Sequence, residues 1–257
     1  MSNRLKVTSV GNGPTLLCLH GLGGGAHWFQ GLAHRLQDRF RVLALDLPGT
    51  GANREGHAPF SIERATDALA QWLAAREPTP VAVLGHSLGA IIGLRLAARI
   101  RLHSLLCVGG LPAVTSANHQ RLSERASLIR RQGMTGLAPR VAEGNFSQSA
   151  LSQRPEIAAL FGHLWESQSA ETYLEGLNSL LEADAGPFLA HAAMPCLVLR
   201  GAEDRYAPAE ESRRFAATLP GPVWFVELEG CAHMPFLESP EAFAAAIADF
   251  LETQRLP

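Results

Sequence analysis

Short apolar runs rich in valine and leucine recur along the chain and alternate with stretches of helical spacing. The runs predict six strands, at residues 15–19, 42–45, 81–84, 105–108, 196–199 and 223–226. Helices are predicted at 28–36, 62–75, 88–98 and 240–251. Because the runs are almost wholly apolar, we expect strands buried on both faces of a mostly parallel sheet. Alternating strands and helices predict an α/β fold with helices on both sides of that sheet.

The alternation stops between residues 111 and 191. Apolar residues recur there at helical spacing, for example Leu160, Phe161, Leu164 and Trp165, and no run is typical of a strand. We therefore expect two parts, an α/β core formed by residues 1–110 and 192–257 and a helical cap inserted at 111–191. Open α/β sheets bind ligands at the carboxyl ends of their strands, so the cap is expected at that edge.

The pentapeptide Gly85-His86-Ser87-Leu88-Gly89 lies between a predicted strand and a predicted helix. In this context the pattern G-x-S-x-G forms a tight turn that exposes the serine, and glycine lets the strand and helix approach each other. An ordinary glycine-rich turn would have the same residues. The pattern favours Ser87 as a nucleophile.

A serine hydroxyl needs an imidazole to take its proton and a carboxylate to orient that imidazole. Asp204 follows the strand at 196–199, and His233 follows the strand at 223–226. The order is Ser, Asp, His, with spacings of 204 − 87 = 117 and 233 − 204 = 29 residues. This order, with each residue just after a strand, indicates a catalytic triad.

The acid has rivals. Glu203 is adjacent in sequence, Asp46 and Asp184 are more distant carboxylates, and Asp204 itself could be a helix N-cap. His233 is one of ten histidines. The triad rests on all three residues having the expected context at once.

Two backbone N–H groups are expected to form an oxyanion hole. The first belongs to Leu88, which follows the nucleophile at the start of a helix. The second belongs to Leu22, within the glycine-rich loop 20–25 that follows the first strand. The stretch 21–26 also fits the dinucleotide pattern G-x-G-x-x-A, with Asp46 placed 46 − 26 = 20 residues later. That alternative leaves the triad residues unexplained.

These motifs together resemble the α/β-hydrolase superfamily, in particular its small, cofactor-free members with a helical cap. The resemblance rests on His20-Gly21, Asp46-Leu47-Pro48-Gly49-Thr50-Gly51, the serine pentapeptide, Gly201 with Asp204 and Pro208, and Gly230 with His233. It implies a mostly parallel eight-stranded sheet, with a further strand near residues 6–10. Within the family, the chain is most similar to the carboxylesterase and 3-oxoadipate enol-lactonase group.

The composition of the chain indicates which classes of binding partner to expect. Lys plus Arg number 22 against 24 Asp plus Glu, a net charge of −2, which does not favour nucleic acid. Four distant cysteines and the absence of a signal-like apolar segment in residues 1–10 indicate a reducing cytoplasm, and we expect no membrane partner. The histidine and cysteine spacings predict no metal site, and we expect no cofactor.

The expected function is hydrolysis of a small-molecule carboxylic ester, lactone or thioester through an acyl-Ser87 intermediate. A carbon–carbon hydrolase or a lyase with the same triad is the alternative, and a non-catalytic ligand receptor is a third class. Turnover of an ester separates the first class from the third.

Substrate contacts are expected from the cap and from aromatic residues after the glycine-rich loop. The candidates are Trp28, Phe29, Phe146 and Trp165, although the cap aromatics could equally form a cap core. Five arginines lie between residues 121 and 140, and Arg121 and Arg125 share a helix face if residues 118–131 are helical. A solvated face is the simpler interpretation. The alternative is that one or two of them hold a substrate carboxylate, which would suit an anionic ester or lactone.

Overall fold

The computed structural model describes residues 5–55, 59–77 and 79–254, and these residues form one twisted sheet with helices on both sides. The strands are β1 (Val7–Val10), β2 (Thr15–Leu19), β3 (Arg41–Leu45), β4 (Ala82–His86), β5 (Ser104–Val108), β6 (Cys196–Gly201) and β7 (Val223–Leu228). Their order is β1-β3-β2-β4-β5-β6-β7, with only β1 antiparallel to its neighbour. The predicted α/β architecture and the strand near residues 6–10 are confirmed.

The predicted number of eight strands is wrong for the part of the chain that the structure describes, which contains seven. Ahead of β1, the backbone of Lys6 is bound by a side chain rather than by another strand. Lys6 N–H donates to Asn53 Oδ1 at 2.7 Å, and Asn53 Nδ2 donates to the Lys6 carbonyl at 3.1 Å. Asn53 Nδ2 also donates to the Asp46 carbonyl at 2.6 Å, so its amide extends the contact between β1 and β3. Only Leu5 and Lys6 precede β1 among the described residues, which is too short a segment for a further strand.

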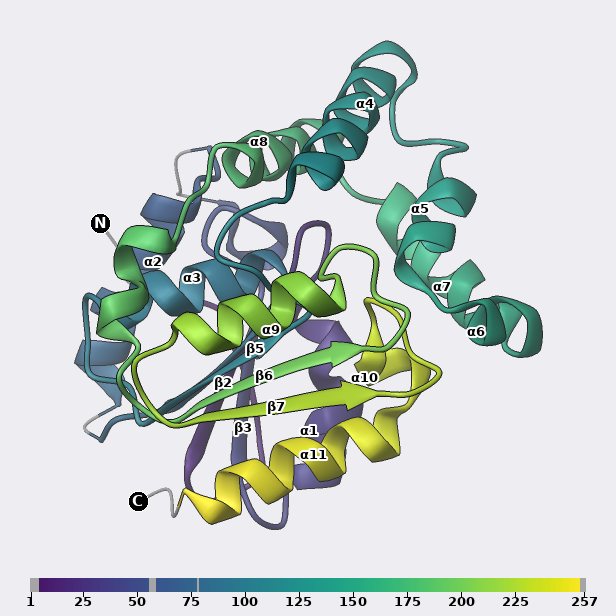
Figure 1. The fold of residues 1–257 in the computed structure, drawn as a ribbon. Helices are drawn as coiled ribbons and strands as arrows, with labels where there is room; N and C mark the ends of the chain where they lie inside the picture. The colour runs from purple at the N-terminus through teal and green to yellow at the C-terminus, as the bar shows by residue number, and fades with distance from the viewer. Residues whose placement is uncertain (1–4, 56–58, 78, 255–257) are drawn as a thin grey trace.

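Helices cover both faces of the sheet, which explains why the central strands are apolar along their whole length. The core helices are α1 (Gln30–Leu36), α2 (Ile62–Arg76), α3 (Leu88–Ala97), α9 (Ala209–Thr218), α10 (Pro235–Glu238) and α11 (Pro240–Thr253), with 3-10 turns at Ala26–Phe29, Gly51–Asn53 and Gly186–His191. Every residue of β2, β4, β5 and β6 is buried. Figure 1 shows α1 and α11 on one face and α2, α3 and α9 on the other.

The strand order creates a switch point at the middle of the sheet. From β2 the chain continues to β3 on one side, and it then crosses to β4 on the other side of β2. The loops that leave the carboxyl ends of β2 and β4 therefore diverge and open a crevice between them. The glycine-rich loop and Ser87 both lie at this crevice.

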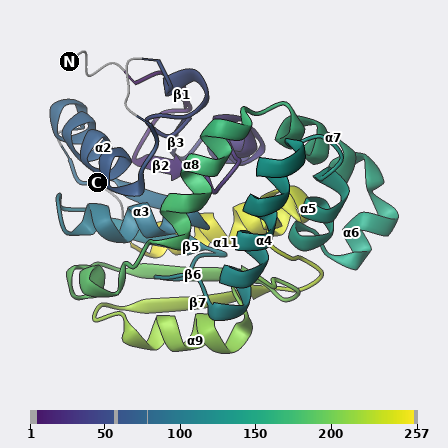
Figure 2. The ribbon, with the colours of Figure 1, turned by 90° about the horizontal axis from the view of Figure 1, so that it is seen from above.

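The segment between β5 and β6 is helical where the sequence predicts a cap. Its helices are α4 (Ser116–Gln132), α5 (Ala138–Asn145), α6 (Gln148–Gln153), α7 (Pro155–Glu166) and α8 (Ala170–Leu181). Three of them, α4, α6 and α8, begin directly after a hydroxyl residue, namely Thr115, Ser147 and Ser169. Each of these hydroxyl side chains accepts the backbone N–H of the residue three positions further along the chain. Figure 2 shows α4 and α8 crossing above the sheet.

We propose that this segment acts as a cap on the α/β core. The 3-10 turn at Gly186–His191 already packs on the core, since Arg95 of α3 lies 4.7 Å from the ring centroid of Phe188. The outermost core residues, 1–4 and 255–257, lie outside the described residues.

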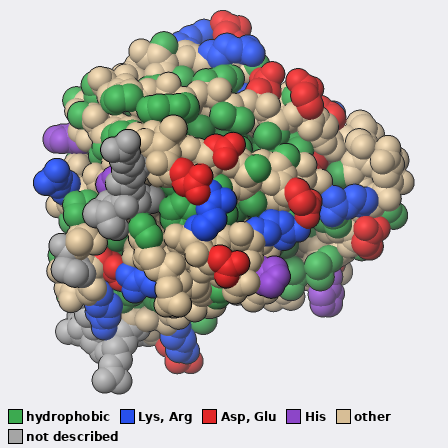
Figure 3. All heavy atoms as spheres, turned by 90° about the horizontal axis from the view of Figure 1, so that it is seen from below, with side chains coloured by type: hydrophobic (Ala, Val, Ile, Leu, Met, Phe, Trp, Pro, Cys, Tyr) green, Lys and Arg blue, Asp and Glu red, His purple; other side chains and the backbone are tan. Residues whose placement is uncertain are grey.

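Charges on the face away from the cap are mixed in sign. Figure 3 shows basic and acidic side chains interspersed there. Arg35 of α1 pairs with Glu241 of α11, and Arg39, three residues after the end of α1, pairs with Glu252 of α11. In the described parts of the chain, the structure has no helix of sufficient length and apolarity to cross a membrane.

Candidate active site

Ser87 occupies the strained turn between β4 and α3. Its backbone has φ +52° and ψ −114°, and it is the single non-glycine residue of positive φ within the described ranges. A Cβ at Gly85 would lie 2.3 Å from the Gly89 carbonyl oxygen, and one at Gly89 would lie 2.3 Å from the Leu19 carbonyl oxygen. Glycine at both positions is therefore a steric requirement of the turn that exposes Ser87.

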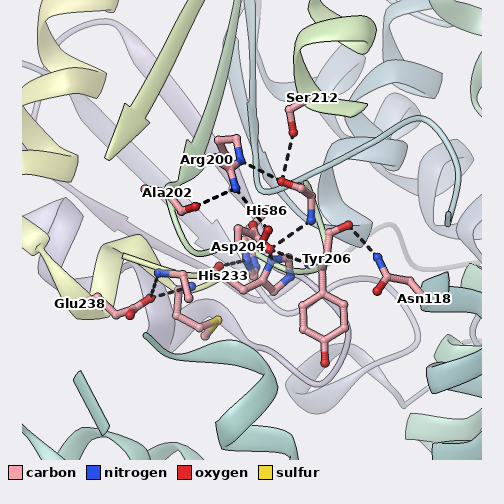
Figure 4. Close-up of polar contacts among 12 residues, drawn as sticks. His86, Asn118, Arg200, Ala202, Asp204, Tyr206, Ser212, His233 and Glu238 are labelled. Carbon is pink, nitrogen blue, oxygen red and sulfur yellow. Dashed lines mark hydrogen bonds and ion pairs between the residues drawn. The ribbon is translucent and has the colours of Figure 1, made fainter. Parts of the chain in front are cut away.

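His233 and Asp204 form a buried hydrogen-bonded pair. His233 Nδ1–H donates to Asp204 Oδ2 at 2.9 Å, and the two residues are only 5% and 3% exposed. Asp204 follows β6 and His233 follows β7, so neighbouring parallel strands deliver both loops to the same edge of the sheet (Figure 4). The pair has the geometry in which a carboxylate fixes an imidazole in one tautomer.

The surroundings of Asp204 keep its carboxyl ionised. Burial opposes ionisation, but the charge and hydrogen bond of His233 outweigh it and hold the pKa of Asp204 below its ordinary value. Two backbone N–H groups add to this effect, from Tyr206 at 2.8 Å and Ala207 at 3.1 Å, both to Oδ1. Asp204 is therefore ionised beside the His233 imidazole.

The rival carboxylates have other partners. Glu203 is exposed, and its Oε2 accepts the N–H of Gln148 at 3.3 Å. Asp184 accepts the N–H of Gly186 at 2.7 Å in the segment between α8 and β6. The structure brings neither side chain to His233.

Ser87 and His233 line one cavity of about 50 Å³, the catalytic pocket. Because Nδ1 of His233 is bound to Asp204, Nε2 is the nitrogen left to take a proton from Ser87. Nε2 has no hydrogen-bond partner among the residues that the structure describes. Bonds of this kind often form only when substrate is bound.

The loop after β2 lies directly against Ser87. A Cβ at Gly21 would be 3.1 Å from the Ser87 Cβ, and Leu22 lines the catalytic pocket. Within the described residues, the backbone N–H groups of Leu22 and Leu88 donate no hydrogen bond. Two unused donors near the serine are what an oxyanion requires, so both residues stay our proposed oxyanion hole.

His20 and Asp46 hold this loop in place. His20 Nδ1–H donates to the Gly21 carbonyl at 2.8 Å, while its Nε2 accepts the N–H of Leu47 at 3.0 Å. Asp46 accepts the N–H groups of Ala26 and Ala52, each at 2.8 Å. Asp46, the carboxylate at the spacing of the dinucleotide pattern, therefore joins two loops of the protein to each other.

His86 is a second imidazole next to that of His233. Its ring centroid lies 4.7 Å from that of His233, and its Nε2 donates to the His233 carbonyl at 2.8 Å. Burial, with the nearby His233, lowers the pKa of His86 to about 3. His86 therefore stays neutral and supports the histidine loop.

The predicted substrate contacts divide into two groups. Trp28, Arg125 and Trp165 line the catalytic pocket. Phe29 is fully buried in the core with its ring 5.6 Å from Phe236, because the 3-10 turn points it inward. Phe146 is also buried, and Phe161 packs edge-on against it at 5.3 Å. The structure does not bring either phenylalanine to the pocket.

Arg121 lies outside the catalytic pocket, in a neighbouring cavity of about 300 Å³ that we call the arginine hollow. Its charged lining residues are Arg121, Arg125, Arg140, Arg205, Glu124 and Glu143. The predicted helix over 118–131 is confirmed as α4, so the shared face of Arg121 and Arg125 is present. Arg125 and Tyr206 line both cavities, so they separate the arginine hollow from the pocket.

Several contacts between cap and catalytic loops had no clear signal in the sequence. The His233 N–H donates to the Asn145 carbonyl at 3.0 Å, and Gln168 Nε2 donates to the Gly23 carbonyl at 2.7 Å. Tyr206 lies with its ring centroid 4.7 Å from that of His233. Only its position two residues after Asp204 could have suggested that it lies at the site.

Glu238 also supports the loop of His233, although no pattern in the sequence indicated it. Its Oε1 accepts the N–H groups of Ala232 and Met234, at 2.8 and 3.2 Å, and its Oε2 accepts the N–H of Ser147 at 2.7 Å. This buried carboxylate brackets His233 and joins its loop to the cap (Figure 4). Among the described residues, no cluster of three or more His, Cys, Asp or Glu could hold a metal ion.

Comparison with known proteins gives consistent matches. The sequence profile described as the alpha/beta hydrolase family matches residues 16–246. The chain is 34% identical over 257 residues to the pimeloyl-[acyl-carrier protein] methyl ester esterase of Chromobacterium violaceum, with 97% of this chain and 99% of that protein covered.

Two solved structures share the fold along nearly the whole chain. The enol-lactonase of Burkholderia xenovorans LB400 has a TM-score of 0.87 at 25% identity, with 96% of each chain covered. A thermophilic esterase of Thermogutta terrifontis has a TM-score of 0.86 at 26% identity, covering 97% of this chain and 93% of that one. The expected similarity to esterases and enol-lactonases is confirmed.

Proposed function

Because this chain belongs to the alpha/beta hydrolase family and is an ester-cleaving hydrolase, we propose that Ser87, His233 and Asp204 carry its reaction. The observation that carries this proposal is the convergence on one crevice of a strained serine, a hydrogen-bonded His–Asp pair and two unused backbone N–H groups. No other serine in the described residues has such a backbone conformation.

In the proposed mechanism each group carries out one step. His233 Nε2 takes the proton of Ser87 as Oγ attacks the ester carbonyl carbon. The oxyanion then receives hydrogen bonds from the N–H groups of Leu22 and Leu88. Collapse of the tetrahedral intermediate breaks the carbon–oxygen ester bond, and His233 gives its proton to the leaving alcohol. Water repeats the sequence on the acyl-serine and releases the acid.

We propose a methyl ester of a carrier-bound acyl chain as the substrate. The support is the relative at 34% identity, whose name states this activity. The catalytic pocket has room only for a small group, but a second cavity of about 340 Å³ adjoins it across the glycine-rich loop. Apolar side chains of Leu47, Phe60 and Leu164 line this larger cavity, which suits an acyl chain.

The arginine hollow supports a substrate that is anionic away from its reacting ester. Four arginines face two glutamates there, and Tyr206 and Arg125 lie between the hollow and the nucleophile. Guanidinium groups bind carboxylate and phosphate well. We therefore propose that an anionic part of the substrate lies in the hollow while the ester lies at Ser87.

A cytoplasmic location is also proposed. The chain has four cysteines, all of them free and buried. Thiols that remain unpaired are typical of a reducing compartment. The proposal includes neither a membrane nor a nucleic acid as a partner.

Turnover is expected to fall as the pH decreases, because a protonated His233 cannot accept the serine proton. The loss should follow a single step, because one general base takes the serine proton. Asp204 has a lowered pKa and that of His86 is about 3, so neither adds a second step between about pH 5 and 8. The measurement is kcat/KM from about pH 5 to 8, in the wild type and in His86→Gln. A flat profile with chemistry rate-limiting would exclude His233 as the base.

Substrate preference is tested with a panel of methyl esters, lactones and acyl thioesters. We expect methyl esters to be hydrolysed fastest, with a burst of alcohol release. An analogue carrying a carboxylate or phosphate beyond the ester should have a lower KM than its neutral partner. In Arg121→Gln and Arg140→Gln this advantage should shrink roughly three- to tenfold and become less salt-sensitive. Equal KM values for charged and neutral esters in the wild type, unaffected by salt, would refute the proposal of an anionic substrate. The proposed roles of Ser87, His233 and Asp204 would not be affected.

A further inference from the structure

One side chain of the cap connects the acid loop to the glycine-rich loop. Arg125 of α4 donates from Nη2 to the Tyr206 hydroxyl at 2.6 Å and from Nη1 to the Tyr173 hydroxyl at 3.1 Å. Tyr206 belongs to the loop of Asp204, and Tyr173 belongs to α8 of the cap. The planar guanidinium therefore fixes two hydroxyl groups at a set separation.

Tyr206 is the residue through which this contact reaches the catalytic pair. Its N–H donates to Asp204 Oδ1 at 2.8 Å, and its ring lies against that of His233 at a centroid distance of 4.7 Å and an angle of 50°. Figure 4 shows Tyr206 beside His233 and Asp204. Any displacement of this ring would change the room available to the imidazole.

Helix α4 holds Tyr206 at both ends. Asn118 Nδ2 donates to the Tyr206 carbonyl at 2.8 Å, and Arg125, two helical turns later on the same face, binds the hydroxyl. The α5 backbone encloses the hydroxyl as well, since a Cβ at Gly144 would lie 2.8 Å from it. The position of Tyr206 is thus determined by the cap and not by its own loop alone.

The second arm of Arg125 leads to the proposed oxyanion loop. Tyr173 packs edge-on against Trp165 at 5.2 Å, and both rings lie over Gly23. A Cβ at Gly23 would be 2.8 Å from Tyr173 and 3.1 Å from Trp165. Tyr173, which Arg125 binds, therefore packs directly against the loop that carries the Leu22 N–H.

We propose that Arg125 is a positioning residue, which holds Tyr206 and Tyr173 so that the cap sets the orientation of His233 and of the oxyanion loop. This role rests on the proposed function of Ser87, His233 and Asp204. It differs from a role in binding the substrate's charge, because it applies equally to a substrate with no charge.

The test uses 4-nitrophenyl acetate, a neutral ester with a short acyl group. In Arg125→Met, kcat should fall about 10- to 100-fold with KM changed less than about twofold, since small misplacements of catalytic groups affect the chemical step. Arg125→Lys should recover part of the loss, because an ammonium can bind one hydroxyl but not hold both in a fixed plane. Arg131→Met, an exposed position on the same helix, is the matched control and should match the wild type.

A second variant keeps the proposal testable if Arg125→Met does not fold. Tyr206→Phe removes only the hydroxyl that Arg125 binds and keeps the ring beside His233. We expect its kcat to fall in the same direction, and the double variant to be no slower than Arg125→Met, because both changes break one contact. The low-field proton resonance of His233 Nδ1–H should shift in both single variants and not in Arg131→Met.

The contrary results are equally clear. An unchanged kcat on the neutral ester in Arg125→Met and Tyr206→Phe, with an unshifted His233 resonance, would overturn the positioning role. A higher KM confined to carboxylate-bearing esters would make Arg125 a substrate contact instead. Neither result would affect the assignment of Ser87, which fails only if Ser87→Ala remains active.

Discussion

Ser87→Ala is expected to give a folded protein whose esterase turnover is lower by roughly four to six orders of magnitude, since the members of a triad act as a unit. The side chain lies at the wall of a pocket and is partly exposed, so losing one oxygen should change the free energy of unfolding little. Turnover of a 4-nitrophenyl ester and thermal unfolding measure the two quantities.

The matched control is Ser149→Ala, at an exposed position on α6 that does not line the catalytic pocket. It should keep wild-type turnover. A fluorophosphonate probe should label Ser87 alone, and the label should be lost in Ser87→Ala but not in Ser149→Ala. A tenth of wild-type activity in Ser87→Ala would show that another group is the nucleophile.

Asp204→Asn is expected to lower turnover by about 10⁴, as in other triads. The structure gives a specific reason. Asp204 Oδ1 accepts two backbone N–H groups, so the amide oxygen of an asparagine would keep that place. Its NH₂ would then face His233 Nδ1, the atom that now donates to Oδ2. The imidazole would be held with its proton on Nε2, where it cannot accept the proton of Ser87.

Glu203→Gln is the matched control for the acid. Glu203 is adjacent in sequence but exposed, so its loss of charge should change turnover less than about threefold. Turnover and the pH profile of both variants decide between the two carboxylates. If Glu203→Gln were the inactive variant and Asp204→Asn the mild one, Glu203 would be the orienting acid.

Local patterns in the sequence were sufficient to predict six of the strands and the α/β layers, and to propose the three triad residues. The apolar runs matched six of the strands to within two residues at either end, because strands buried on both faces must be apolar throughout. The tight turn around Ser87 could be predicted since its two glycines are neighbours of the serine itself.

Contacts between residues distant in the chain were decided only by the tertiary structure. No local pattern distinguishes Phe29, which faces the core, from Trp28, which faces the pocket. The eighth strand was expected from family resemblance, but the described residues form seven, with only Leu5 and Lys6 ahead of β1.

The arginines illustrate the same division. Helical spacing placed Arg121 and Arg125 on one face of α4, as the structure has them. Which of them reaches the catalytic pocket depends on Tyr173 and Tyr206, 48 and 81 residues further along the chain. Local spacing determines the face of a helix on which a side chain lies, because that depends on backbone geometry alone. The partner of that side chain depends on how the helix packs against the rest of the fold, and only the assembled cap and core decide it.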